Sequence, residues 1–144
     1  MKRFILSILA VFAIAAAVVG CGSSNTSSGN TELQGTWKAT SPDETVTITV
    51  TFSGNSWTMT ETSTSASQSV QLSGTFTLDS AANPKTIDML YVSSVPATPG
   101  IAGTTVKGIY QITGNNLMIA TADTASDPRP TELNESNSMP LTKQ

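Results

Sequence analysis

Apolar and polar residues alternate along most of the chain after residue 32, with a period of two. In residues 45–52 every second position is valine, isoleucine or phenylalanine, and threonine fills the positions between them. Residues 70–78 repeat the alternation, with Gly74 at one of the apolar positions. This pattern predicts strands that bury one face. No apolar stripe of helical period follows residue 32, so the pattern predicts an all-β domain.

Turn sequences divide the alternating segments into about eight predicted strands. Residues 53–56 and 113–116 are typical of tight hairpin turns, and residues 79–85 form a third turn. Residues 93–103 and 122–138 are expected to be longer loops. Sequential strands without a covering helix can close into a barrel or pack as a β-sandwich. We favour a small eight-stranded up-and-down barrel, because closure removes exposed strand edges.

The first residues differ from the rest of the chain. A basic pair at residues 2–3 precedes an apolar run over residues 4–19. The run is short for a transmembrane helix, which needs about 20 apolar residues, and it fits a signal peptide. It leads to Cys21, the only cysteine, which follows Val-Val-Gly at residues 18–20. This segment resembles the lipobox of bacterial lipoprotein signal peptides.

The lipobox resemblance implies cleavage before Cys21, acyl chains such as palmitate on that cysteine, and attachment to a membrane of the cell envelope. An ordinary secretory signal is the alternative, and it would leave an unpaired thiol at the new terminus. Gly22 favours the outer membrane if the host has two membranes. The predicted organisation is a signal peptide at 1–20, a lipidated cysteine and flexible tether at 21–32, and the β-domain at 33–144.

Charge and residue types narrow the possible functions. Cleavage removes two of the seven basic residues and leaves five against ten acidic ones, a net charge of −5. This balance argues against nucleic-acid binding. The chain has no histidine, which excludes histidine-based catalytic triads and histidine metal sites. An acylated Cys21 supplies no nucleophile, metal ligand or disulfide, so we expect a monomeric domain that is not an enzyme and uses no metal or organic cofactor.

Five short motifs follow one another in a specific order. They are Leu33-Gln34-Gly35-Thr36-Trp37, Gly74-Thr75-Phe76-Thr77-Leu78-Asp79, Pro84-Lys85-Thr86-Ile87-Asp88, Gly108-Ile109-Tyr110 and Arg129-Pro130-Thr131. In this order they resemble an uncharacterised family of bacterial lipocalin-like lipoprotein domains. The resemblance implies a lipocalin-like barrel, with Trp37 across its closed end and Arg129 as the candidate partner of Trp37. It also implies that Leu33 lies in a plug before the first strand.

Several large side chains are candidates to line the barrel interior around a ligand, or else to fill it as a core. These are Phe52, Trp57, Met59, Phe76, Tyr91 and Tyr110. Small barrels have room for their own side chains or for one small ligand. The predicted inner faces carry almost no polar group, so a ligand held there would be apolar and bound with little specificity.

One charged cluster, Asp79, Lys85 and Asp88, flanks the predicted turn at 79–85. It has two interpretations, a carboxylate pair poised by a lysine or a structural arrangement. In the structural interpretation, which we favour, Asp79 caps the turn while Lys85 and Asp88 form a weak surface pair.

Two functions remain open from the sequence. The first is a membrane-anchored envelope lipoprotein whose barrel binds or carries a small apolar ligand. The second is a protein-interaction module, such as an inhibitor or an envelope assembly partner, with a filled barrel and working loops at 93–103 and 122–138. No motif supports a hydrolase.

Overall fold

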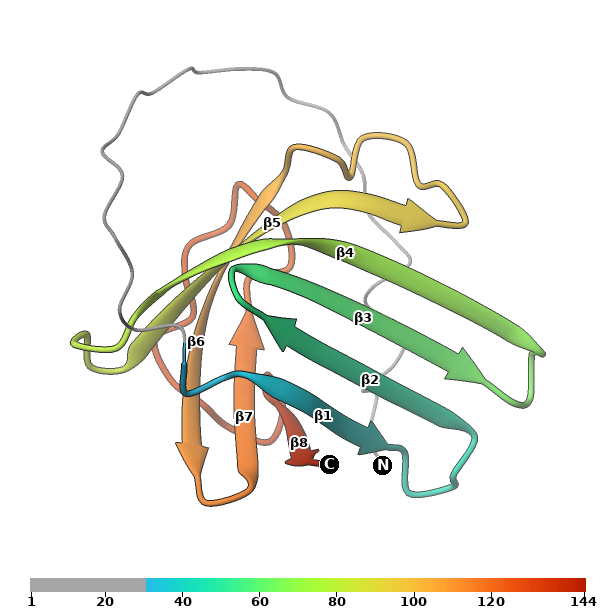
Figure 1. Cartoon of the computed structure of the whole chain (residues 1–144), viewed down its shortest axis with the longest axis horizontal. Helices are drawn as coiled ribbons and strands as arrows, with labels where there is room; N and C mark the ends of the chain where they lie inside the picture. The colour runs from blue at the N-terminus through green and yellow to red at the C-terminus, as the bar shows by residue number, and fades with distance from the viewer. Residues whose placement is uncertain (1–30) are drawn as a thin grey trace.

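The computed structural model describes residues 31–144, which form a closed barrel of eight antiparallel strands (Figure 1). The strands are β1 (Gly35–Thr40), β2 (Val46–Ser53), β3 (Ser56–Ser63), β4 (Gln68–Asp79), β5 (Lys85–Val95), β6 (Thr105–Thr113), β7 (Asn116–Thr121) and β8 (Met139–Lys143). Each strand pairs with the next in sequence, and β8 pairs with β1. The predicted up-and-down barrel is confirmed, and the sandwich is excluded. The predicted signal peptide, Cys21 and most of the tether lie outside the described residues.

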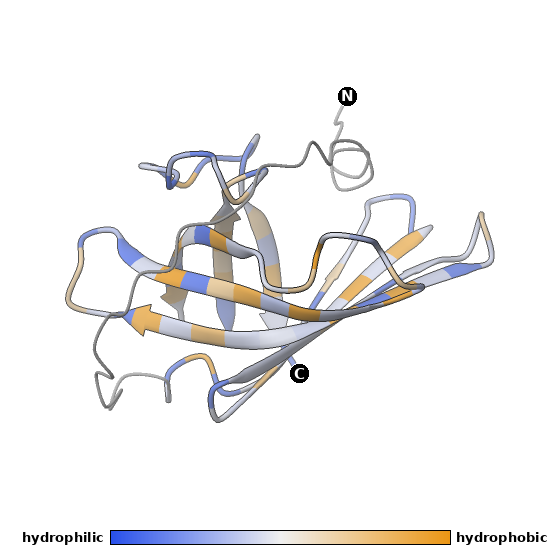
Figure 2. Cartoon of the chain, turned by 90° about the horizontal axis from the view of Figure 1, so that it is seen from above, coloured by the Kyte–Doolittle hydropathy of each residue, from blue (hydrophilic) through white to orange (hydrophobic). Residues whose placement is uncertain are grey.

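The alternation in β2 and β3 explains how the sheet acquires an inner and an outer face. Val50 lies opposite Met59, and Phe52 lies opposite Trp57, so the apolar sets of both strands meet on one face. The threonines between them also lie opposite one another, on the other face. Threonine suits such outward-facing strand positions because its branched Cβ favours extended backbone. Figure 2 shows the alternation as orange and pale segments along the strands.

The core gathers toward one end of the barrel, which we call the plugged end. Here β1 begins and the β2–β3, β4–β5 and β6–β7 turns lie. Inward-facing side chains close to these turns are almost completely buried, namely Trp37, Phe52, Trp57, Phe76, Ile87, Tyr110, Leu117 and Leu141. Leu33, in the turn before β1, is also fully buried, and its carbonyl accepts a hydrogen bond from Trp37 Nε1 at 2.7 Å. The prediction that Leu33 lies in a plug agrees with this contact.

The opposite end, which we call the distal end, is less completely paired. The β5–β6 pairing stops at Leu90, and β1 and β8 share only two residue pairs. Strands β2 to β5 extend past their shorter neighbours at this end (Figure 1). Several inner-face residues here are only partly buried, namely Ala39, Ile48, Met59, Val70 and Tyr91, whereas Val46 at the start of β2 is buried. The barrel is therefore filled at one end and only partly filled at the other.

A β-bulge in the β4–β5 pairing lies between these two ends. The register shifts between Ser73 and Gly74, and Gly74 lies opposite both Trp57 and Tyr91. A Cβ at Gly74 would lie 1.8 Å from the carbonyl oxygen of Leu90. Only glycine allows the two backbones to approach this closely.

Candidate functional site

The six predicted lining residues separate into two groups. Four belong to the filled core, namely Phe52, Trp57, Phe76 and Tyr110, and each is at most 2% exposed. The rings of Phe52 and Phe76 meet edge to face with centroids 5.0 Å apart, an arrangement that aromatic pairs favour. Met59 and Tyr91 are only partly buried and lie toward the distal end. The plugged half of the interior is thus occupied by the protein's own side chains.

Trp57 and Tyr91 mark the boundary between the filled core and the distal end. Their rings meet edge to face with centroids 5.0 Å apart. Trp57 Nε1 donates a hydrogen bond to the carbonyl of Thr75 at 3.1 Å, which fixes the indole. Burial raises the pKa of the Tyr91 hydroxyl. Tyr91 is therefore held as a neutral, mainly apolar wall on the distal side of the core.

Beyond this boundary, the inner face carries a row of directly opposed residues. Ala39 of β1 lies opposite Ile48 of β2, Ile48 lies opposite Glu61 of β3, and Glu61 lies opposite Val70 of β4. All four are partly buried. We call them the distal row. It combines three apolar side chains with one carboxyl group on the face that elsewhere forms the core.

Glu61 is the residue of this row that sequence reasoning missed. Burial raises the pKa of its carboxyl group above the ordinary value. The signal was available in the alternation, because Trp57, Met59 and Glu61 occupy every second position of one strand. That alternation gives Glu61 the same inward direction as Trp57.

At the plugged end, a hydrogen-bonded network joins the turn before β1 to the barrel wall. Glu32 Oε2 lies 2.6 Å from Lys85 Nζ, and Glu32 Oε1 accepts a hydrogen bond from the Tyr110 hydroxyl. Burial alone would raise the pKa of Glu32, but the hydrogen bonds from Lys85 and Tyr110 outweigh it and lower the pKa. Burial and the adjacent Glu32 both raise the pKa of Tyr110. The sequence interpretation placed Glu32 in the flexible tether, whereas the structure makes it part of the folded domain.

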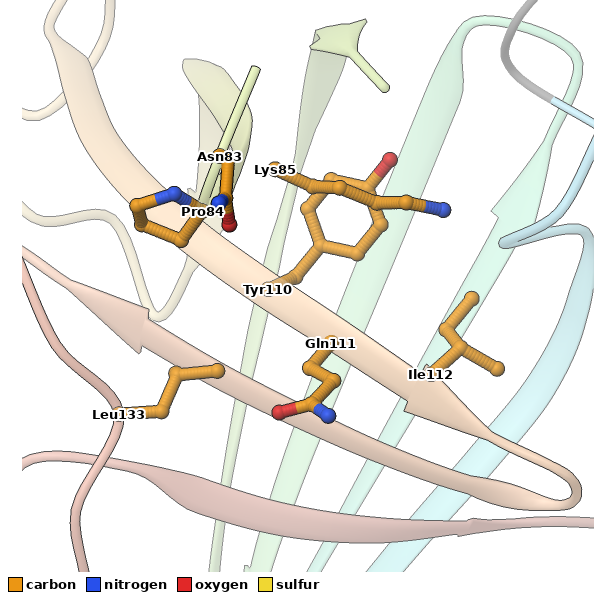
Figure 3. A pocket seen from close by; sticks show the side chains of 7 residues that line it. All are labelled: Asn83, Pro84, Lys85, Tyr110, Gln111, Ile112 and Leu133. Carbon is orange, nitrogen blue, oxygen red and sulfur yellow. The ribbon is translucent and has the colours of Figure 1, made fainter. Parts of the chain in front are cut away.

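A pocket of about 300 Å³ lies beside this network (Figure 3). Its lining residues are Asn83, Pro84, Lys85, Tyr110, Gln111, Ile112 and Leu133. Tyr110 and Gln111, which are neighbours in β6, point to opposite sides in this view. Lys85 is the one charged residue among those seven, and its ammonium group is already paired with Glu32. The pocket therefore offers no free charge to orient a ligand.

The predicted cluster of Asp79, Lys85 and Asp88 is divided among different partners. Asp79 Oδ1 accepts hydrogen bonds from two backbone amides of the following turn at 3.0 and 3.1 Å, so its role as a turn cap is confirmed. The expected Lys85–Asp88 pair is wrong, because Lys85 pairs with Glu32 and Asp88 pairs with Arg129. Residues three apart on a strand point to opposite faces, and this separates the two.

Trp37 and Arg129 also have different neighbours from those that the lipocalin resemblance implies. The cation over the Trp37 ring is Lys143, with Nζ 5.2 Å from the ring centroid. Arg129 Nη1 donates to the carbonyls of Ile87 at 3.2 Å and Gly108 at 2.6 Å. These contacts join the β7–β8 loop to β5 and β6. Trp37 does lie in the plugged end, as expected, beneath Leu33.

Comparison with known proteins adds no relative, because no family model, no curated protein and no solved structure matches this chain.

Within residues 31–144, no group of three or more potential metal-ligating side chains is placed to hold an ion. The same part of the chain contains no helix long and apolar enough to cross a bilayer. The fold and the distal row define the molecule as a small β-barrel with one filled end and one partly apolar end.

Proposed function

We propose that this chain is an envelope lipoprotein, anchored through lipid on Cys21, whose barrel binds a small apolar molecule at its distal end. The observation that carries the proposal is the uneven filling of the barrel. Its largest buried side chains lie at the plugged end, whereas the inward apolar residues of the distal row remain partly exposed. The resemblance to lipocalin-like lipoprotein domains gives independent support.

The physical argument concerns apolar surface that folding has left in contact with water. Covering such surface stabilises a complex by about 25 cal/mol for each Å² removed from water. Ile48 and Val70 face inward but are only partly covered by the protein's own side chains. A ligand that packs against them would complete the core. The aromatic residues of the plugged half leave the ligand no path through the barrel, so its remainder would project from the distal end.

Binding can be tested by titrating decanol into the domain from Gly22 to Gln144 and following backbone amide NMR signals. This chain contains the whole closed sheet. We expect shifts at the distal ends of β2, β3 and β4 and none at the plugged end. Ile48→Thr should weaken binding at least fivefold, because it removes apolar contact area. Thr49→Ala, on the other face of the same strand, is the matched control and should bind as the native chain does. Shifts confined to the plugged end would contradict the proposal.

Anchoring can be tested separately in a bacterial host. The mature protein should partition with membranes, and mass spectrometry should find an acylated peptide that begins at Cys21. Cys21→Ser should move the protein to the soluble fraction. A native protein found in the soluble fraction with an unmodified Cys21 would contradict the lipid anchor, without bearing on ligand binding.

A second candidate function, a protein-interaction module, is favoured by the free edge of β5. Within the described residues, Val92 and Val95 are the exposed large apolar side chains, at 54% and 61%. Both follow Leu90, the last β5 residue that pairs with β6. Unpaired strand edges recruit a further strand from a partner. Pull-down of an envelope protein that is lost with Val95→Lys, while decanol binding is retained, would support this function.

A further inference from the structure

We propose that Glu61 makes the distal end selective for amphiphiles that carry an amine or a quaternary ammonium group on an apolar chain. This inference rests on the proposed function and adds the chemical class of the ligand. The apolar chain would pack on the distal row and its boundary, and the cationic head would pair with the Glu61 carboxylate. Long-chain alcohols would bind more weakly, and fatty acids more weakly still.

The first support is the position of Glu61 in the sheet. It lies between Ile48 and Val70, which are its direct neighbours on β2 and β4. Strand alternation directs it to the same face as Met59 and Trp57. Glu61 is partly buried between the apolar side chains of Ile48 and Val70, and withdrawing a charged group from water is unfavourable unless the charge is paired. The position of Glu61 therefore favours binding of a counter-ion, which the fold does not supply.

The second support is that no cation of the described residues pairs with Glu61, and three of the five have partners elsewhere. Lys85 pairs with Glu32, Arg129 pairs with Asp88, and Lys143 lies over Trp37. The remaining two described basic residues, Lys38 and Lys107, are exposed. No hydrogen bond or ion pair joins Glu61 to another side chain in residues 31–144. Burial raises the pKa of Glu61, as expected for a carboxyl group without such a partner.

The third support comes from the chemistry of the alternatives. A calcium ion needs six to eight oxygen ligands, and the neighbours of Glu61 in the distal row are hydrocarbon side chains. A fatty acid would bring a second carboxylate next to the first, and like charges at close range repel. A neutral alcohol would leave the Glu61 charge unpaired. An ammonium group pairs with the carboxylate while its chain covers the apolar residues.

The test uses three probes with the same ten-carbon chain, namely decylamine, decanol and decanoate. Each is titrated calorimetrically into the chain from Gly22 to Gln144 at about pH 8, below the micellar concentration of the two ionic probes and below the solubility limit of decanol. At this pH the amine is protonated, and the pH lies far above the ordinary pKa of a carboxyl group. We expect decylamine to bind at least tenfold more tightly than decanol, and decanoate to bind more weakly than decanol.

Two variants decide whether Glu61 causes the preference for decylamine over decanol. Glu61→Gln keeps the size and polarity of the side chain but removes its charge, so decylamine should bind only as tightly as decanol. Decanol affinity should stay within twofold of the native value. Glu135→Gln removes the same charge from an exposed loop position and should keep the native preference. This control separates a specific pair from general attraction to an acidic protein.

Three results would overturn the inference, and they differ in what else they affect. Equal affinity of the native chain for decylamine and decanol would show that Glu61 does not recognise the head group. A preference that persists in Glu61→Gln would assign it to the overall charge. In both cases decanol binding, and with it the proposed function, would stand. If no probe binds, the proposed function fails together with the inference.

Discussion

The plugged end and the distal end belong to the same strands, yet they are filled in opposite ways. In β3, Trp57 at the plugged end is buried against Thr75 and Tyr91, whereas Glu61 at the distal end has apolar neighbours and no ionic partner among the described residues. Fully buried aromatic side chains fill one half of the inner face, and partly buried apolar side chains with one carboxyl group occupy the other.

Under the proposed function, this difference divides stability and ligand binding between the two ends of one sheet. Well-packed aromatic residues supply most of the stabilisation by burial. That leaves the distal row free to carry groups that destabilise the folded chain, such as a carboxyl group in an apolar setting. Functional sites commonly reduce stability in this way, and the rest of the fold compensates for them.

The largest effect should come from truncating the core at the plugged end. Trp57→Ala should lower the free energy of unfolding by about 4 kcal/mol, because it leaves a large void next to Phe52 and removes a fixed indole. Ile48→Ala, in the partly exposed distal row, should cost about 1 kcal/mol. Urea denaturation of both variants measures the two losses in the free energy of unfolding. Comparable losses would show that the two ends contribute equally to stability.

A smaller but still severe loss of stability should follow from adding a side chain at the bulge, where the backbones of β4 and β5 lie very close together. Gly74→Ala should cost about 3 kcal/mol, because its Cβ would clash with the Leu90 carbonyl. Gly114→Ala is the matched control, since φ is +59° and no atom lies within 4 Å of the added carbon. Its cost should be about 1 kcal/mol of backbone strain alone. Thermal unfolding of both variants measures the difference, and equal losses would contradict the close approach of the two strands.

The Glu32 network should contribute about 1 kcal/mol, since its ion pair is partly exposed and screened. The lowered pKa of Glu32 means that this stabilisation is complete above the unfolded-state pKa of its carboxyl group. It is lost as the pH falls through the lower folded-state value. Glu32→Gln should therefore be less stable than the native chain at neutral pH, with the difference disappearing in acid. Chemical denaturation across pH measures this, and a difference that does not change with pH would contradict the ionic contribution.

The smallest effect should have the opposite sign, and it concerns Glu61. Its raised pKa means that stability is greatest while the carboxyl group is protonated and falls as the pH rises through the folded-state value. Glu61→Gln should therefore be more stable than the native chain at neutral pH, by less than about 1 kcal/mol. Acidification should remove the gain. A loss of stability at neutral pH would indicate that Glu61 has a favourable partner within the folded chain.

Local patterns predict the barrel well because they need only neighbouring residues. The alternation from Val46 to Phe52 determines which face of β2 is buried, and hairpin turns determine which strands pair. Glu61 was missed because a single charge near the end of a strand is ordinarily taken as the end of the buried face. Its neighbours Ile48 and Val70 become evident only once the register is known.

Long-range ion pairs were not predictable in the same way. Glu32 and Lys85 are 53 residues apart, and their contact depends on how the turn before β1 crosses the end of the barrel. Lys143 reaches Trp37 because β8 closes the sheet on β1, so the identity of that cation follows from the closure geometry. The resemblance to lipocalin-like domains implied Arg129 as this cation, but Arg129 instead joins the β7–β8 loop to the barrel wall.

The attachment of Glu32 to Lys85 and Tyr110 also determines the direction in which a tethered barrel would be held. Cys21 precedes Glu32 by eleven residues, a length that spans at most about 40 Å. If Cys21 carries the proposed lipid, a force on that residue would reach the barrel through Glu32, at the plugged end. With the tether extended, the distal end of the barrel would point away from the bilayer. A ligand would then be exchanged with the aqueous compartment or with a facing protein, and the filled end would stand toward the membrane.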